Sequence, residues 1–255
     1  MPSVARLSIA PVRSLGLEHP DQIELTERGV VEDRRFFLAD ETGRIVDRII
    51  VGSLVQIATH TDPDGQTLRM SFPDGQVIDD DVRLSDHREI QIHGRTGVGR
   101  VVEGPWAAAL STFCERPITM IRCDHPGGTR SGNAASLVSD GSIAELARHA
   151  GLDHVDARRF RMLIELDGAE PHEEDGWIGH RVAIGEAVLA VTKPDARCAI
   201  TTQDPNTGER DLDTLRTIIN YRGLREGKHA DFGVLADVAQ PGRIHVGDTV
   251  RILAD

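Results

Sequence analysis

Residues 193–208, KPDARCAITTQDPNTG, decide how the rest of the chain is interpreted. A strand-like segment runs through Pro194 into a polar loop centred on Cys198, and a turn sequence (DPNTG, 204–208) follows. Arg197 precedes the cysteine, and a neighbouring cation lowers the pKa of a thiol and favours the thiolate. The thiolate is the form that ligates a metal or carries a persulfide. Spacing alone fits equally well a small inert cysteine buried at the end of a strand.

Upstream of this stretch, the first hundred residues are rich in short strand patterns. Turn sequences such as DETG (40–43), DPDG (62–65) and PDG (73–75) separate them. The expected strands lie at 4–9, 22–25, 35–39, 44–50, 67–72 and 89–93. Many short strands with frequent turns predict a small β-barrel or sheet domain over residues 1–100.

The remainder, residues 101–255, mixes strands with a few helices. Helical spacing or capping residues predict helices at 106–114, 140–149 and 213–220. Strand patterns follow at 117–122, 158–166, 182–191 (two strands), 231–235, 243–246 and 249–253. The predicted class is therefore α+β and β-rich, with two domains that meet near residue 100.

Composition excludes several classes of protein. The chain has 255 residues and a formal net charge of -12, which argues against nonspecific nucleic-acid binding and against an anionic membrane surface. It has no 18-residue apolar run and no signal-peptide pattern at its start. Three cysteines without a CxxC pair make a poor disulfide, zinc or iron–sulfur framework, so the expected compartment is the cytoplasm.

Several stretches, in the same order, resemble the motifs of MOSC-domain proteins, and in particular of the amidoxime-reducing-component family. The run RCAITTQDPNTGERD resembles the signature of MOSC domains. The other matching stretches cover nearly the whole chain: APVRS (10–14), GVVEDRRF (29–36), FRMLI (160–164), PHEEDGWIG (171–179) and PGRIHVGD (241–248). The resemblance implies an N-terminal MOSC β-barrel joined to a MOSC β-barrel domain with a few helices.

The resemblance also implies a molybdenum cofactor, a molybdopterin whose metal is ligated by Cys198. Arginine offers bidentate donors to its pterin phosphate. The cofactor-binding residues implied around Cys198 are Arg13, Ser14, Arg34, Arg161, Arg197, Thr201 and Thr202. For each arginine, a solvated surface charge or a structural ion pair is the simpler interpretation from the residue type alone.

Two departures from the family pattern affect this site. Arg13 stands where the family has lysine, which keeps the charge and changes its geometry. Leu163 stands where the family has asparagine, so a polar contact to the cofactor is lost unless Asn133 replaces it.

The resemblance implies a molybdenum-dependent oxidoreductase that reduces N-hydroxylated or N-oxide small molecules. Electrons would come from a separate electron-transfer protein, because the chain has no flavin fingerprint and no cysteine set for an iron–sulfur cluster. One alternative is a sulfur carrier in cofactor sulfuration, with a persulfide on Cys198. Another is a non-catalytic module that binds the cofactor. Molybdenum content separates the oxidoreductase from the sulfur carrier.

Overall fold

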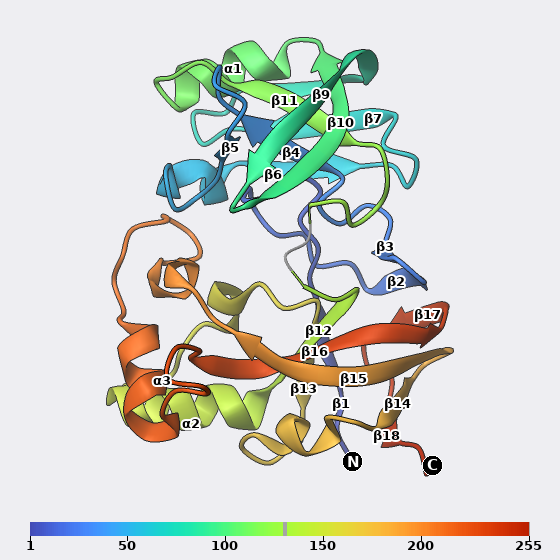
Figure 1. The fold of residues 1–255 in the computed structure, drawn as a ribbon, viewed down its shortest axis with the longest axis vertical. Helices are drawn as coiled ribbons and strands as arrows, with labels where there is room; N and C mark the ends of the chain where they lie inside the picture. Colours follow the sequence, from blue (N-terminus) through green and yellow to red (C-terminus); the bar gives the residue numbers. More distant parts are fainter. Residues whose placement is uncertain (130–131, 255) are drawn as a thin grey trace.

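Sheets build both halves of the molecule, which lie one above the other in Figure 1. The computed structural model describes residues 1–129 and 132–254. The lower half is organised around a seven-stranded sheet, whose order is β1 (Ser3–Leu7), β13 (Ile164–Asp167), β12 (Ala135–Ser139), β16 (Asp231–Gln240), β15 (Ala187–Ala196), β14 (Arg181–Ile184) and β18 (Val250–Ile252). Within this sheet β12 and β13 run parallel, and the other neighbouring strands are antiparallel.

A three-stranded ribbon completes the lower half. It consists of β17 (Gly242–His245), β2 (Gln22–Thr26) and β3 (Gly29–Val30). Leu25 and Ile244 of this ribbon pack in one apolar core with Leu189 and Val234 of the large sheet. The first thirty residues therefore pack mainly with the C-terminal part of the chain, and both termini lie at the same end of the molecule (Figure 1).

The upper half contains two more sheets. One has the order β5 (Ile45–Val46), β4 (Phe36–Ala39), β11 (Thr119–Cys123), β10 (Arg95–Glu103) and β9 (Arg83–Ile92); the other has the order β6 (Ala58–Thr61), β7 (Thr67–Ser71) and β8 (Val77–Asp81). Phe36, Met70 and Trp106 of these sheets and of α1 (Trp106–Phe113) share a core. The indole N–H of Trp106 donates to the carbonyl of Leu68 at 3.2 Å, which satisfies its one polar group inside that core.

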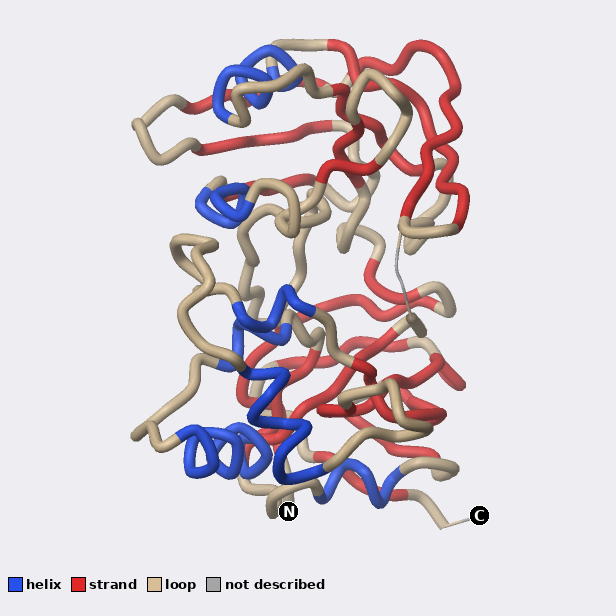
Figure 2. Tube along the Cα trace, turned by 60° about the vertical axis from the view of Figure 1, so that its left-hand side comes forward, coloured by secondary structure: helices blue, strands red, loops and turns tan. Residues whose placement is uncertain are grey.

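Two helices cover one side of the seven-stranded sheet (Figures 1 and 2). They are α2 (Asp140–Ala150) and α3 (Thr214–Arg222). The side chains of Ser139 and Asp213 cap their N-termini, and each accepts a backbone N–H three residues along. Leu146, Ile218 and Phe232 pack between these helices and the sheet.

The structure confirms the β-rich mixed class and the three predicted helices. The strand expected over 158–166 is wrong: a 3-10 turn (Ala157–Phe160) precedes Arg161, and the strand begins only at Ile164. The apolar residues of this segment serve two cores, because Phe160 packs under the helices and Leu166 packs on the other core. The domain boundary near residue 100 stays a prediction; the five-stranded sheet continues past it to β11.

The two halves touch closely where Gly52 meets Gly208. A Cβ added to Gly52 would lie 2.4 Å from the carbonyl oxygen of Gly208, and Gly208 itself has a φ of +78°. Gly52 begins the 3-10 turn Gly52–Gln56, and Gly208 ends the DPNTG turn that follows the cysteine loop. Any side chain at Gly52 must therefore push the two backbones apart.

We expect Gly52→Ala to lower the free energy of unfolding by about 1–3 kcal/mol, the usual cost of forcing atoms into a packed contact. The measurement is the melting temperature by circular dichroism. Gly176→Ala is the control, because an added Cβ there meets nothing within 4 Å. Equal melting temperatures for the two variants would show that the glycine contact does not hold the halves together.

Candidate functional site

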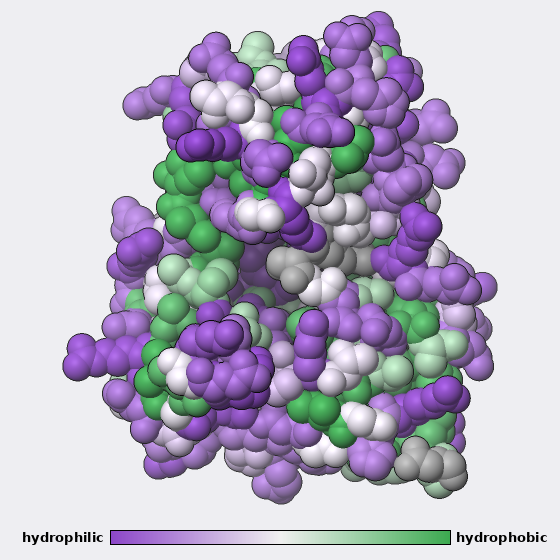
Figure 3. All heavy atoms as spheres, in the orientation of Figure 1, coloured by the Kyte–Doolittle hydropathy of each residue, from purple (hydrophilic) through white to green (hydrophobic). Residues whose placement is uncertain are grey.

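A cavity of about 600 Å³, here called the central cavity, opens between the two halves. This volume lies in the range of small-molecule and cofactor sites. Figure 3 shows the surface hollowed between the halves on the face it presents. Six of the predicted site residues line the central cavity together with Cys198: Arg13, Ser14, Arg34, Asn133, Arg161 and Arg197.

Two crossing segments place the N-terminal site residues. The backbone N–H of Arg13 donates to the carbonyl of Phe36 at 2.7 Å, and that of Arg34 donates to the carbonyl of Ala10 at 2.7 Å. The buried carboxylate of Asp33 accepts the N–H of Ala10 at 2.9 Å. These bonds lock segments 10–14 and 33–36 side by side, so their side chains reach the same wall of the cavity.

Three of the site residues adopt left-handed backbone conformations. Ser14, Arg34 and Arg161 have φ values of 77°, 54° and 52°. A non-glycine residue in this region carries a conformational cost, and such residues cluster at functional sites. His93, which also lines the cavity, has a φ of 45°, so these left-handed residues indicate a candidate functional site at the cavity wall.

The central cavity is strongly cationic although the chain is acidic. Its lining includes two carboxylates, Asp33 and Asp195, and seven cationic side chains: Arg13, Arg34, Arg48, Arg161, Lys193, Arg197 and Arg225. Focused positive charge inside an acidic protein suits a polyanionic ligand.

Burial and mutual repulsion perturb these arginines. Burial, followed by repulsion from Arg34 and Arg95, lowers the pKa of Arg13 to about 10. Burial, with Arg48 and Arg34 as the next causes, lowers the pKa of Arg161 well below its ordinary value. The guanidinium groups are therefore held close together at an electrostatic cost.

Arg197, which precedes Cys198 in the sequence, directs its guanidinium group to other residues. Arg197 pairs with Asp195 and donates to the carbonyl of Phe160 at 2.5 Å, while its guanidinium lies 5.4 Å from the Phe160 ring centroid. Arg48, distant in sequence, interacts electrostatically with Cys198: burial and Arg159 lower the pKa of Arg48 to about 10, and Asp204 and Cys198 act in the opposite direction. No local pattern in the sequence pointed to Arg48.

Arg48 also ties the cysteine loop to the upper half. Its side chain is fully buried and donates to Oε1 of Gln203 at 2.9 Å, and the Gln203 amide donates back to the carbonyl of Arg48 at 2.7 Å. Cys198 is exposed at the start of this loop, and burial raises the pKa of Cys114 and Cys123 to about 11. Cys198 is thus the accessible thiol at the cavity.

The other predicted residues lie differently. Thr201 and Thr202 do not line the central cavity; their hydroxyls donate to the carbonyls of Cys198 (3.1 Å) and Ala199 (2.7 Å) and so hold the turn. Asn133 lines the cavity, but its amide nitrogen donates to Thr192 and Asp237. Leu163 also lines it and supplies an apolar surface.

Sequence reasoning also missed a histidine–carboxylate pair. Nε2 of His93 lies 2.7 Å from Oδ2 of Asp47, and Asp47 is buried while His93 lines the central cavity. The backbone N–H of Ile49 donates to the other oxygen of Asp47 at 3.0 Å. The two residues come from turns that lie far apart in the chain, so spacing could not reveal the pair.

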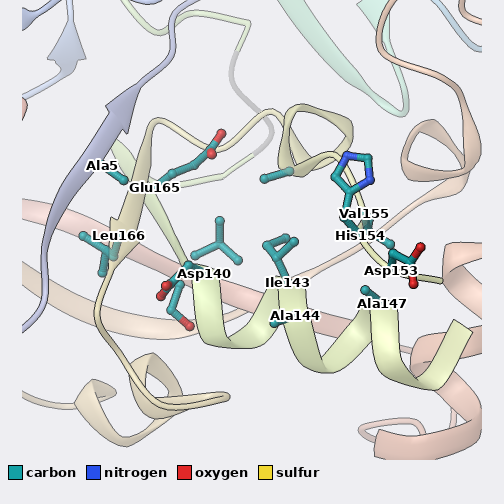
Figure 4. Close-up of a pocket in the computed structure, with 13 residues that line it drawn as sticks. Ala5, Asp140, Ile143, Ala144, Ala147, Asp153, His154, Val155, Glu165 and Leu166 are labelled. Atoms are coloured by element: carbon teal, nitrogen blue, oxygen red, sulfur yellow. The ribbon is translucent and has the colours of Figure 1, made fainter. Parts of the chain in front are cut away.

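A separate, mostly apolar cavity of about 240 Å³ lies against α2 (Figure 4). Ile143 and Ala147 of the helix line it together with Glu165 and Leu166 of β13. It contains none of the predicted site residues. Within residues 1–129 and 132–254, no group of three or more His, Cys, Asp or Glu side chains is placed to hold a metal ion.

Two protein-family models match this chain. The MOSC domain model matches residues 124–251, and the model of the MOSC N-terminal beta barrel domain matches residues 1–117. The chain belongs to the MOSC family. The human mitochondrial amidoxime-reducing component 1 is 26% identical over 283 residues, which cover 98% of this chain and 83% of the relative.

Other relatives are larger or more distant. The molybdenum cofactor sulfurase of Caenorhabditis briggsae is 24% identical over 270 residues, and the alignment covers 100% of this MOSC chain. The chain spans only about a third (36%) of that relative's length. Among solved structures, the YuaD protein from Bacillus subtilis aligns with a TM-score of 0.48 and 13% identity over 98% of this chain and 94% of its own.

The Arg48–Gln203 contact predicts a measurable coupling. Arg48→Met or Gln203→Met leaves a buried polar partner unpaired, so each should lower the free energy of unfolding by about 1–3 kcal/mol. The double variant should lose less than the sum, as found for residues in contact. Urea unfolding measures all three. Arg69→Met is the control, because Arg69 pairs with Asp79 at the exposed surface, where such pairs contribute little. Additive losses would contradict the coupling.

Proposed function

We propose that this MOSC protein binds a molybdenum cofactor and reduces N-hydroxylated or N-oxide small molecules with electrons from a separate electron-transfer protein. The observation that carries the proposal is the cationic central cavity with the exposed Cys198 in its wall. The human relative bears the name of an amidoxime-reducing component and matches this chain over nearly its whole length.

The donor set fits a polyanionic pterin. Nη1 of Arg48, Nη1 of Arg161 and Nε of Arg197 are buried, and within the described part of the chain each has no hydrogen-bond partner. Charged donors left unpaired are costly, and a bound phosphate would satisfy them. Arg13, Ser14 and the other cavity arginines would hold the pterin and its phosphate.

When bound, the cofactor would supply the two-electron redox chemistry needed to remove oxygen from the substrate. Cys198 is the proposed thiolate ligand. Thr201 and Thr202 act in the proposal by shaping the turn that presents this sulfur. Leu163 gives the cavity an apolar surface where the family has an amide, which favours a different substrate or cofactor contact.

Removing oxygen as water consumes protons, and we assign their delivery to His93. Its Nε2 is in hydrogen-bond contact with the buried Asp47, which leaves Nδ1 to hold and donate a proton. Asp47 acts as a positioning residue that fixes the orientation of the ring.

A second function is favoured by the sulfurase relatives. The exposed Cys198 could carry a persulfide, and the alignment with the Caenorhabditis sulfurase covers all of this chain. We infer that the chain would then act as a sulfur carrier for the same cofactor.

No helix within the described residues is long and apolar enough to span a membrane. The cytoplasm remains our proposed location.

Elemental analysis tests the first proposal. Protein made in a cofactor-competent host should contain near-stoichiometric molybdenum. Cys198→Ala should lose most of the metal. It should also lose the amidoxime-reductase activity that is measured with a chemical reductant as electron donor. Cys114→Ala is the matched control, because Cys114 does not line the central cavity. If the wild type carries no molybdenum while cofactor supply is adequate, the reductase proposal fails, and persulfide on Cys198 becomes the next measurement.

The proton assignment predicts a second kinetic effect. His93→Gln should lower kcat by on the order of 10²-fold, the usual contribution of a general acid, while molybdenum content is kept. His87→Gln is the control, because His87 is an exposed histidine that does not line the cavity. An unchanged kcat in the loaded His93 variant would remove His93 from the mechanism.

A further inference from the structure

A neighbouring cavity of about 380 Å³ lies on the other side of two of the cavity arginines. Both Arg48 and Arg161 line this neighbouring cavity as well as the central one. Residues of both halves enclose it, among them Leu17, Gln56 and Asn206. It shares no other lining residue with the central cavity, so the two spaces meet only at this arginine pair.

The charge of the neighbouring cavity has one sign. Its lining contains three guanidinium groups, of Arg48, Arg158 and Arg161, and no carboxylate. Arg158 forms an ion pair with Asp156, which does not line the cavity and accepts from its Nη2 at 2.6 Å and from its Nε at 3.0 Å. Gln56 is turned to the DPNTG loop and donates to the carbonyl of Thr207 at 3.2 Å.

Each arginine of this pair has one buried N–H group without an acceptor in the protein, and these are the donors offered above to a bound phosphate. Arg48 is fully buried, and its Nη1 has no partner within the described residues. Nη1 of Arg161 is buried and unpartnered in the same way, while its Nη2 donates to the carbonyl of Leu15 at 2.8 Å. Buried donors of like charge repel each other and lack acceptors, and a small anion placed between them would relieve both costs.

We propose that the neighbouring cavity is a second oxyanion site, which binds a phosphate-type group on Arg48, Arg158 and Arg161. A guanidinium N–H donates a charge-assisted hydrogen bond to an oxyanion, and Arg48 and Arg161 each offer a buried Nη1 for such a bond. The oxyanion is either free phosphate or the phosphate end of a ligand whose body lies in the central cavity. The site needs no metal and does not require Cys198, but it shares Arg48 and Arg161 with the central cavity. Where the occupant is the phosphate end of the cofactor, the inference rests on the proposed cofactor binding.

Cofactor-free full-length protein titrated with inorganic phosphate tests the site by amide NMR. Leu17 and Ala58 line only the neighbouring cavity, and Ser14 and Ala135 line only the central one, so their amide signals report the two spaces separately. Saturable shifts at Leu17 and Ala58 are expected. No shift at these two amides overturns the proposal.

Substitutions of residues that line one of the two cavities, but not both, show which cavity binds the phosphate. Gln56→Glu adds a carboxylate to the exposed rim of the neighbouring cavity and should weaken the phosphate response of Leu17 and Ala58 at least tenfold. Gln56→Leu, which loses the same hydrogen bond without adding charge, should keep the response. Arg34 lines only the central cavity, so Arg34→Gln should also keep the phosphate response of Leu17 and Ala58. Loss of the response in Arg34→Gln but not in Gln56→Glu would assign the phosphate to the central cavity and overturn the proposal.

Cofactor-loaded protein distinguishes the two sources. If free phosphate still shifts Leu17 and Ala58 in the loaded protein, the site takes a separate oxyanion. If these two signals already sit at their phosphate-bound positions and no longer respond, the phosphate end of the cofactor occupies the site. Both outcomes support the site, and unshifted, unresponsive signals in both preparations refute it. Molybdenum content reports the reductase proposal separately.

Discussion

Like-charged guanidinium groups held together at the seam between the halves are the constraint on which the site depends. The fold anchors several of them on backbone carbonyls: Arg161 on Leu15, Arg13 on Thr129, and Arg48 on Asp204 together with the Gln203 side chain. A neutral carbonyl fixes the position of a guanidinium without cancelling its charge, whereas a carboxylate would cancel it. Only Asp33 and Asp195 among the lining residues offset the seven cations. The cavity thus keeps a net positive field inside a protein whose net charge is -12.

The same constraint explains why the strained backbone lies where it does. Arg34 and Arg161 lie just before strands β4 and β13, whose residues Phe36 and Ile164 are fully buried, and both adopt the left-handed region at the cavity wall. Ser14 follows Arg13, whose backbone N–H is bonded to the carbonyl of Phe36, so the same packed strand holds its turn. Strain and repulsion at the seam are therefore offset by ordinary apolar packing some residues away. A ligand that neutralised the guanidinium groups would stabilise the folded protein by mass action.

Sequence motifs predicted some of the residues that line the cavity but not those whose contacts join distant parts of the chain. Arg13, Ser14, Arg34, Arg161 and Cys198 were found because each belongs to a recognisable local pattern, and the fold brings all of them to one cavity. Arg48, His93 and Asp47 were not predicted because their contacts join residues far apart in the sequence. Arg48 bonds Gln203 across the seam, and His93 pairs with Asp47 within the upper half. Adjacency in sequence also misled: Arg197 precedes Cys198, yet it turns to Asp195 and Phe160. The error over 158–166 has the same origin, because a continuous apolar run can serve two cores.

The exposed thiol of Cys198 lies on a loop that both halves hold, which has a consequence for the proposed function. The loop after β15 belongs to the lower half by chain connection, but Gly208 packs on Gly52 and Gln203 bonds Arg48, both of the upper half. The position of Cys198 is therefore tied to the relative placement of the halves, and so are the arginines that come from each of them. A displacement of one half would therefore change both the position of the thiol and the spacing of the arginines that come from different halves. An anion that bridges the halves through these arginines would thereby also fix the position of the sulfur, which makes ligand binding and the preorganisation of Cys198 one event.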